Sequence, residues 1–221
     1  SLLDPIIGPP LASIYPHIRI PDWFPPEGIV AMGHLSAIAG AVGFAFSTAH
    51  WWGGIVAAVG IIGNHFADCI DGRHARATDQ CRNGGELLDH FTDPISFAYW
   101  MVGLAVACGR LDLGLVAVIV LMAMAVLTNL RAKLTGEFTL ASFGPTEFKT
   151  LLAVLGITLA STVALAPAAS TNVCLIGFVS LTLVGVIMLP VQLYRSIREV
   201  NRCGTQPDTS EWETSRSARS Q

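Results

Sequence analysis

The sequence predicts an all-α polytopic membrane protein, with six transmembrane helices and a short N-terminal interfacial segment. Two compositional observations support this fold class: 52% of the 221 residues are hydrophobic and only 13% are charged. A soluble domain usually carries about 25% charged residues. The third observation is that most of the chain divides into apolar stretches of roughly 20 residues, the length that a helix needs to cross a bilayer.

Residues 1–27 are the predicted interfacial segment. They are rich in proline, which prevents one long helix. We expect an irregular or short amphipathic stretch that lies at the membrane surface, anchored by Trp23 and Phe24.

Six apolar stretches follow within residues 28–194, the predicted transmembrane catalytic domain. They cover approximately residues 28–49, 52–70, 87–109, 112–131, 149–168 and 172–194. Residues 195–221 form a polar tail, which we expect to continue the last helix and then to end in disorder.

The basic residues predict the orientation. With six spans, 12 of the 13 Lys and Arg residues fall on one side of the membrane, and only Arg110 falls on the other. Because basic residues concentrate on the cytoplasmic side, we expect both termini and the link between the second and third spans to be cytoplasmic. The net charge of −3 predicts no nucleic-acid partner.

Four aspartates flank the link between the second and third spans. Asp68 and Asp71 are three residues apart and Asp89 and Asp93 are four apart, so each pair shares one face of a helix. Four clustered carboxylates repel one another and require compensating charge. Oxygen-only ligation suits Mg²⁺, Mn²⁺ or Ca²⁺, and four acids suffice for two metal ions with one acid acting as general base.

Two alternatives remain at this point. The acids could pair with Arg73 and Arg76, although two arginines leave negative charge in excess. Gly72 and Gly85 could serve turn or capping geometry, or they could let a flat group such as a nucleotide approach the backbone.

The complete run resembles the signature of the CDP-alcohol phosphotransferase family. Its eight defining positions are Asp68, Asp71, Gly72, Ala75, Arg76, Gly85, Asp89 and Asp93, all at the family's spacing. The family's six-span core would cover about residues 26–195.

The resemblance implies an enzyme with two divalent ions, Mg²⁺ or Mn²⁺, and a CDP-linked donor. Asp68, Asp71 and Asp89 would be metal ligands, and Asp93 would complete the metal site and act as the catalytic base. Gly72, Ala75, Arg76 and Gly85 would line the CDP pocket. An alcohol would attack the donor's β-phosphoryl group and CMP would leave.

Two phrases indicate the branch. The run from Gly85 to His90 resembles the Gly-Glu-Leu-Phe-Asp-His of choline and ethanolamine phosphotransferases, and the run from Gly144 to Glu147 resembles their Gly-Pro-Thr-Glu. Phosphatidylglycerophosphate synthases instead have Pro after the third Asp and Lys after the fourth, where this chain has His90 and Pro94. The expected substrates are therefore CDP-choline or CDP-ethanolamine and diacylglycerol, and the alternative is a CDP-diacylglycerol-dependent phosphatidyltransferase.

Five further residues are candidates for substrate binding: His90, Arg131, Lys133, Glu147 and Lys149. The basic ones could hold a phosphate or headgroup, or they could serve membrane topology alone. The expected partners are membrane lipids and CDP-linked small molecules, and a homodimer is compatible with the sequence.

Two other classes of function compete with an enzyme. A divalent-cation transporter would place acids deep in several spans, but the last three stretches contain no Asp or Glu at mid-depth. A binding protein that has lost catalysis is the other alternative, and the eight intact positions disfavour it.

Overall fold

The apolar stretches become long helices. In the computed structural model, which describes residues 3–136 and 144–205, no strand occurs among the described residues. The elements are α1 Asp4–Ser13, η1 Tyr15–His17, α2 Pro26–Phe46, α3 Trp51–Ala77, α4 Asn83–Ala107, α5 Leu111–Thr135, α6 Pro145–Leu165, η2 Pro167–Ala169 and α7 Ser170–Cys203.

Five of these helices are long and apolar enough to cross a membrane: α2, α3, α5, α6 and α7. Helix α4 corresponds to the third predicted span, and its first half carries Asp89 and Asp93. The all-α polytopic fold is therefore confirmed. The count of six spans and the cytoplasmic position of the termini remain predictions.

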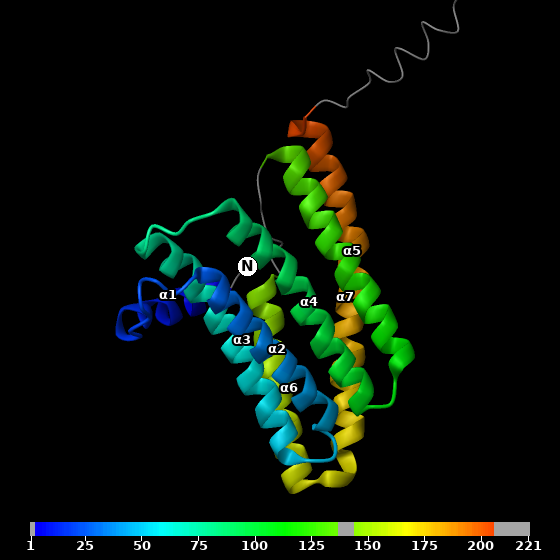
Figure 1. The fold of residues 1–221 in the computed structure, drawn as a ribbon. Helices are drawn as coiled ribbons and strands as arrows, with labels where there is room; N and C mark the ends of the chain where they lie inside the picture. The colour runs from blue at the N-terminus through cyan, green and yellow to red at the C-terminus, as the bar shows by residue number, and fades with distance from the viewer. Residues whose placement is uncertain (1–2, 137–143, 206–221) are drawn as a thin grey trace, which may run out of the picture.

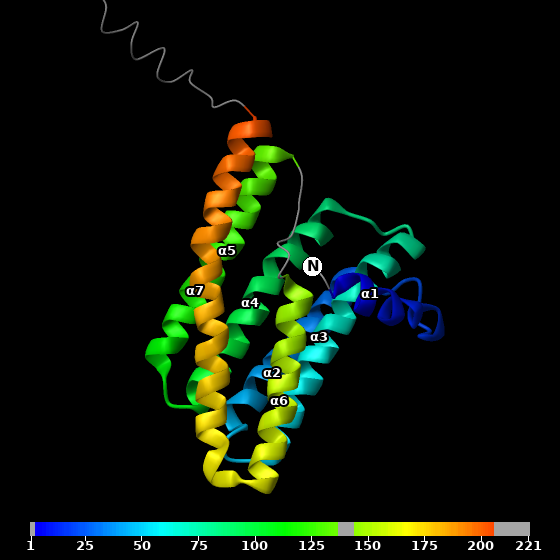
Figure 2. The same cartoon turned by 180° about the vertical axis from the view of Figure 1, so that it is seen from behind.

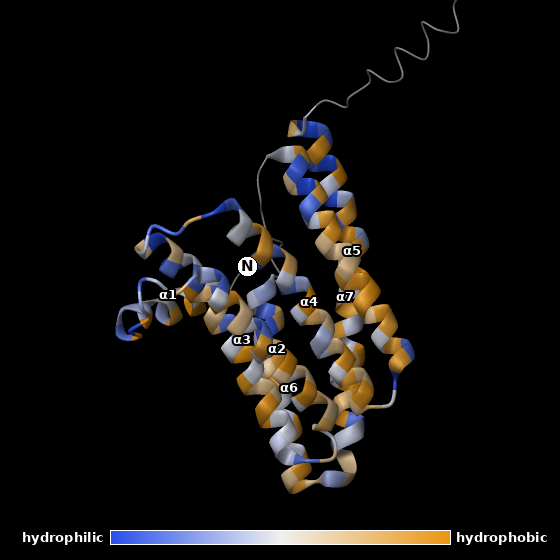
Figure 3. Cartoon of the chain, viewed as in Figure 1, coloured by the Kyte–Doolittle hydropathy of each residue, from blue (hydrophilic) through white to orange (hydrophobic). Residues whose placement is uncertain are grey.

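The helices form one bundle. Helices α2, α3 and α6 lie on one side of it, α5 and α7 run side by side on the other, and α4 lies between them (Figure 1, Figure 2). Hydrophobic residues dominate the bundle, while polar residues gather around α1, the link between α3 and α4, and the C-terminal ends of α5 and α7 (Figure 3).

One helix extends well beyond its predicted end. Helix α3 continues to Ala77, well past the expected end at residue 70, so the link to α4 is residues 78–82. Helix α7 runs past residue 194 to Cys203, into the segment that was expected to continue the last helix. Hydropathy falls where a helix meets the membrane surface, but the hydrogen-bonded backbone continues into the polar region. The predicted tail from residue 206 onward lies outside the described residues.

Small residues allow the helices of the bundle to pack closely, as is usual in membranes. Gly54 of α3 lies against Gly156 and Ala160 of α6, and a Cβ at residue 54 would be 2.3 Å from the Gly156 carbonyl oxygen. Larger side chains fill the centre, where Trp100 of α4 is fully buried and donates a 3.0 Å hydrogen bond to the Ala37 carbonyl. These contacts fix α3 and α4, which carry the aspartates.

The N-terminal segment is tied to α3 by one histidine. His74 is fully buried, and its Nε2 lies 2.8 Å from the Phe24 carbonyl oxygen. Because a carbonyl only accepts, Nε2 carries a hydrogen, and in the neutral ring Nδ1 accepts from the Tyr15 hydroxyl at 2.9 Å. Phe24 packs beside Ile29 and Ala67, so it is a packing residue of the protein, whereas Trp23 is 78% exposed.

Candidate active site

Helices α3 and α4 each supply two aspartates to one end of the bundle. Asp68, Asp89 and Asp93 line the same cavity. Asp71 is buried and accepts a hydrogen bond from the backbone N–H of Gly72. The i,i+3 and i,i+4 spacings place each pair on one helix face, and the tertiary fold turns both faces toward the same region.

A lysine from α6 bridges the two pairs. The Lys149 Nζ donates hydrogen bonds to Asp68 Oδ2 at 2.9 Å and to Asp93 Oδ1 at 3.2 Å, and only 2% of the Lys149 side chain is exposed. The ring of Phe97 lies 5.6 Å from the same nitrogen. His65 lies one turn before Asp68 on α3, and its Nδ1 is 3.7 Å from Asp68 Oδ2. A buried ammonium requires such pairing, since an uncompensated charge inside a protein is strongly destabilising.

The chemistry of the four carboxylates fits a hard divalent cation, because all the donors are oxygens and their charge exceeds that of Lys149. The geometry is not closed around an ion, however. Within residues 3–136 and 144–205, no three His, Cys, Asp or Glu side chains converge closely enough to hold one metal. Lys149 instead forms ion pairs with two of the four carboxylates, those of Asp68 and Asp93.

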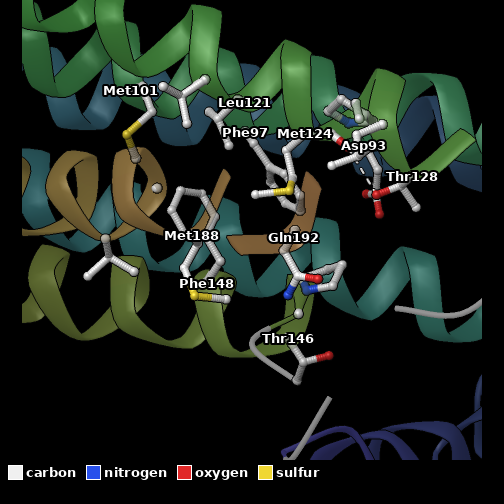
Figure 4. A pocket seen from close by; sticks show the side chains of 18 of the residues that line it. Asp93, Phe97, Met101, Leu121, Met124, Thr128, Thr146, Phe148, Met188 and Gln192 are labelled. Carbon is white, nitrogen blue, oxygen red and sulfur yellow. Dashed lines mark hydrogen bonds between the residues drawn. The ribbon is translucent and has the colours of Figure 1, made fainter. Parts of the chain in front are cut away.

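A cavity of about 520 Å³ extends from the aspartates into the apolar part of the bundle. Figure 4 shows Asp93 and Thr128 at one end and Met101 at the other, with Phe97, Met124 and Met188 along the cavity. Its walls come from α4, α5, α6 and α7, with His65, Asp68 and Cys69 of α3 at the polar end. Charged groups at one end and an apolar channel beyond them suit a molecule with a polar head and hydrocarbon chains.

The predicted nucleotide residues lie beside the aspartates. A Cβ at Gly72 would meet the Arg76 guanidinium at 3.2 Å, so that side chain folds back over the glycine. Arg76 also lines a shallow hollow with Tyr15, Arg73 and Ala77. Gly85 has open space around it, with nothing within 4 Å of an added Cβ, and Ala75 is partly exposed.

The five candidates for substrate binding lie in different surroundings. His90 and Arg131 line the cavity, and Arg131 also pairs with Glu199 of α7 at 3.5 Å. Lys133 is exposed. Glu147 is buried and accepts hydrogen bonds from the backbone N–H groups of Gly144 and Leu3, both at 2.8 Å, so it caps the start of α6.

The sequence analysis overlooked three polar residues that α6 and α7 supply to the cavity. Gln192 is 7% exposed, and Thr146 and Thr182 are also buried. The available signal was a glutamine inside an otherwise apolar span, since polar side chains at membrane depth usually face a cavity or another helix.

The chain matches the model of a known protein family and is similar to known proteins. The family model for CDP-alcohol phosphatidyltransferase matches residues 29–197. Cholinephosphotransferase 1 of Homo sapiens is 29% identical over 110 residues, which are 46% of this chain and 27% of the relative. The Gallus gallus protein of that name is 32% identical over 113 residues, 48% and 33% of the two chains. The alignments thus span about a quarter to a third of these relatives.

Proposed function

Because the chain belongs to the CDP-alcohol phosphatidyltransferase family, we propose that it is a membrane enzyme of phospholipid synthesis. It transfers a phosphoalcohol or phosphatidyl group from a CDP-linked donor to an alcohol and releases CMP. The observation that carries this proposal is the position of Asp93, which lies with Asp68 against Lys149 and also lines the apolar cavity. A reacting hydroxyl on a lipid in that cavity would be next to the carboxylates.

In the proposed reaction the acceptor hydroxyl gives its proton to Asp93 and its oxygen bonds to the β-phosphorus of the donor. The bond from that phosphorus to the CMP oxygen breaks, and CMP leaves. Mg²⁺ or Mn²⁺ held by Asp68, Asp71, Asp89 and Asp93 would neutralise the pyrophosphate and the charge that develops on CMP. Gly72, Ala75, Arg76 and Gly85 border the nucleotide, where the Arg76 guanidinium meets its phosphates.

For the substrates we propose a CDP-aminoalcohol and diacylglycerol, with the reaction at the cytoplasmic face. Two observations support this choice: the similarity to cholinephosphotransferases and the apolar lining of the cavity, which suits acyl chains. A CDP-diacylglycerol-dependent reaction on a small alcohol would use the same carboxylates with the lipid on the donor.

The test is a release assay for CMP with purified protein in liposomes. CDP-choline, CDP-ethanolamine and CDP-diacylglycerol are each combined with diacylglycerol, glycerol phosphate or inositol phosphate, with Mg²⁺ or Mn²⁺ present. We expect turnover with a CDP-aminoalcohol and diacylglycerol. If CDP-diacylglycerol is the only donor that supports turnover, the choice of substrate is overturned. If no pair of donor and acceptor releases CMP, the proposed function is overturned.

A variant separates chemistry from binding. Asp93→Asn should lower kcat by about 10²- to 10⁴-fold, the usual contribution of a general base, while CDP binding persists. Asp79→Asn is the matched control, because it removes a carboxylate from the α3–α4 link at an exposed position. Asp79 has φ +57°, a conformation that asparagine also tolerates. Equal activity of the two variants would refute the role of Asp93.

A further inference from the structure

Lys149 is a buried cation held by groups that the proposed function assigns to metal ions. It is one of two lysines in the chain, and it reaches Asp68 and Asp93 across 81 and 56 residues of sequence. Helices α3, α4 and α6 therefore meet at one ammonium group. With 2% of the side chain exposed, its charge has no direct access to bulk water.

The contacts of Lys149 engage both carboxylates through one oxygen each. Nζ is 2.9 Å from Asp68 Oδ2 and 3.2 Å from Asp93 Oδ1. A divalent cation held by these two aspartates would bring a second positive charge close to the ammonium. Like charges at such a separation repel strongly where little water intervenes. Lys149 and the cation would therefore oppose one another's binding at Asp68 and Asp93.

We propose that Lys149 is an internal counterion that competes with the divalent cation for Asp68 and Asp93. The proposal rests on the proposed function, since it takes these aspartates as metal ligands. The ammonium holds α3 and α4 together across the carboxylates. For these aspartates to hold a cation, the flexible lysine stem would have to withdraw the ammonium from them.

The withdrawn ammonium needs new acceptors, and a substrate can supply them. Phe97, 5.6 Å from Nζ, lines the cavity, so the ammonium stays at the edge of the substrate site. The phosphate oxygens of a CDP-linked donor are acceptors of the required charge. Donor binding then frees the aspartates for the cation, which makes the affinities for the two ligands interdependent.

The first experiment measures Mn²⁺ affinity without substrate, from the spectrum of free Mn²⁺ in electron paramagnetic resonance. Lys149→Met should bind Mn²⁺ on the order of tenfold more tightly than the natural protein, comparable to the effect of one neighbouring charge on an ionisable group. Lys133→Met is the matched control, since it removes an exposed lysine, and it should leave the affinity unchanged. Equal or weaker Mn²⁺ binding by Lys149→Met would overturn the proposal, as would the same gain in Lys133→Met.

A second measurement uses the unmodified protein, in case Lys149→Met does not fold. Reductive methylation labels accessible lysine amines, and mass spectrometry compares Lys149 with Lys133. Lys149 should be protected without metal, become more reactive with saturating Mg²⁺, and be protected again when CDP is added. Unchanged labelling of Lys149 on Mg²⁺ binding would overturn the counterion role. CMP release measures the proposed function separately, so an active enzyme with unchanged Lys149 labelling would refute this inference alone.

Discussion

Replacing Gly54 by alanine tests how closely α3 and α6 must approach. The new Cβ would lie 2.3 Å from the Gly156 carbonyl oxygen and 2.7 Å from the Ala160 nitrogen. Ordinary van der Waals contact begins near 3.4 Å, so the two backbones must separate by 3.4 − 2.3 = 1.1 Å at this point. Such overpacking costs about 1–3 kcal/mol.

Gly63→Ala is the matched control on the same helix. Its Cβ would be 3.2 Å from Ser36 Oγ and 3.3 Å from Ser36 Cβ, so the serine side chain must move by only a few tenths of an ångström. Both variants gain the roughly 1 kcal/mol by which alanine exceeds glycine in helix propensity, and this gain cancels between them. We therefore expect Gly54→Ala to be about 1–3 kcal/mol less stable than Gly63→Ala.

The assay is thermal unfolding in one detergent, followed by tryptophan fluorescence, with CMP release measured on the same samples. Separation of α3 and α6 should also loosen the 2.9 Å contact between Lys149 and Asp68, so Gly54→Ala should lose activity as well. A melting temperature of Gly54→Ala equal to or above that of Gly63→Ala would refute the close-packing argument.

Three further predictions address other contacts. Tyr15→Phe deprives the buried His74 Nδ1 of its hydroxyl partner and should lower the free energy of unfolding by about 1–3 kcal/mol. Limited proteolysis should then cleave the N-terminal segment faster, and an unchanged cleavage rate would contradict this prediction. Trp100→Phe removes the hydrogen bond to the Ala37 carbonyl and leaves a cavity, so the free energy of unfolding should fall by about 1–3 kcal/mol. An unchanged melting temperature in the thermal assay would mean that the packing of α2 against α4 does not depend on this hydrogen bond. Chelation with EDTA should abolish CMP release, and excess Mg²⁺ or Mn²⁺ should restore it, because the acids are oxygen donors; activity that survives complete chelation would exclude the metal role.

Sequence alone predicted most of the helices, because length and hydropathy are local properties of each segment. It misplaced the end of α3, which continues to Ala77 rather than ending near residue 70. Hydropathy reports the environment of a residue, whereas the helix ends where the backbone hydrogen bonds stop. The proline-rich N-terminus was expected to be an irregular or short amphipathic stretch, and the structure forms the ten-residue helix α1 there.

For the site, sequence alone determined which acids share a helix face, since spacings of three and four residues fix this by helix geometry. Only the tertiary structure showed that Lys149 lies between Asp68 and Asp93 and that Glu147 caps the start of α6. Lys149 had been a candidate for substrate binding because it is basic, and Glu147 because it ends the Gly-Pro-Thr-Glu phrase. Their partners depend on how α3, α4 and α6 pack, and the close contact at Gly54 helps to decide that packing.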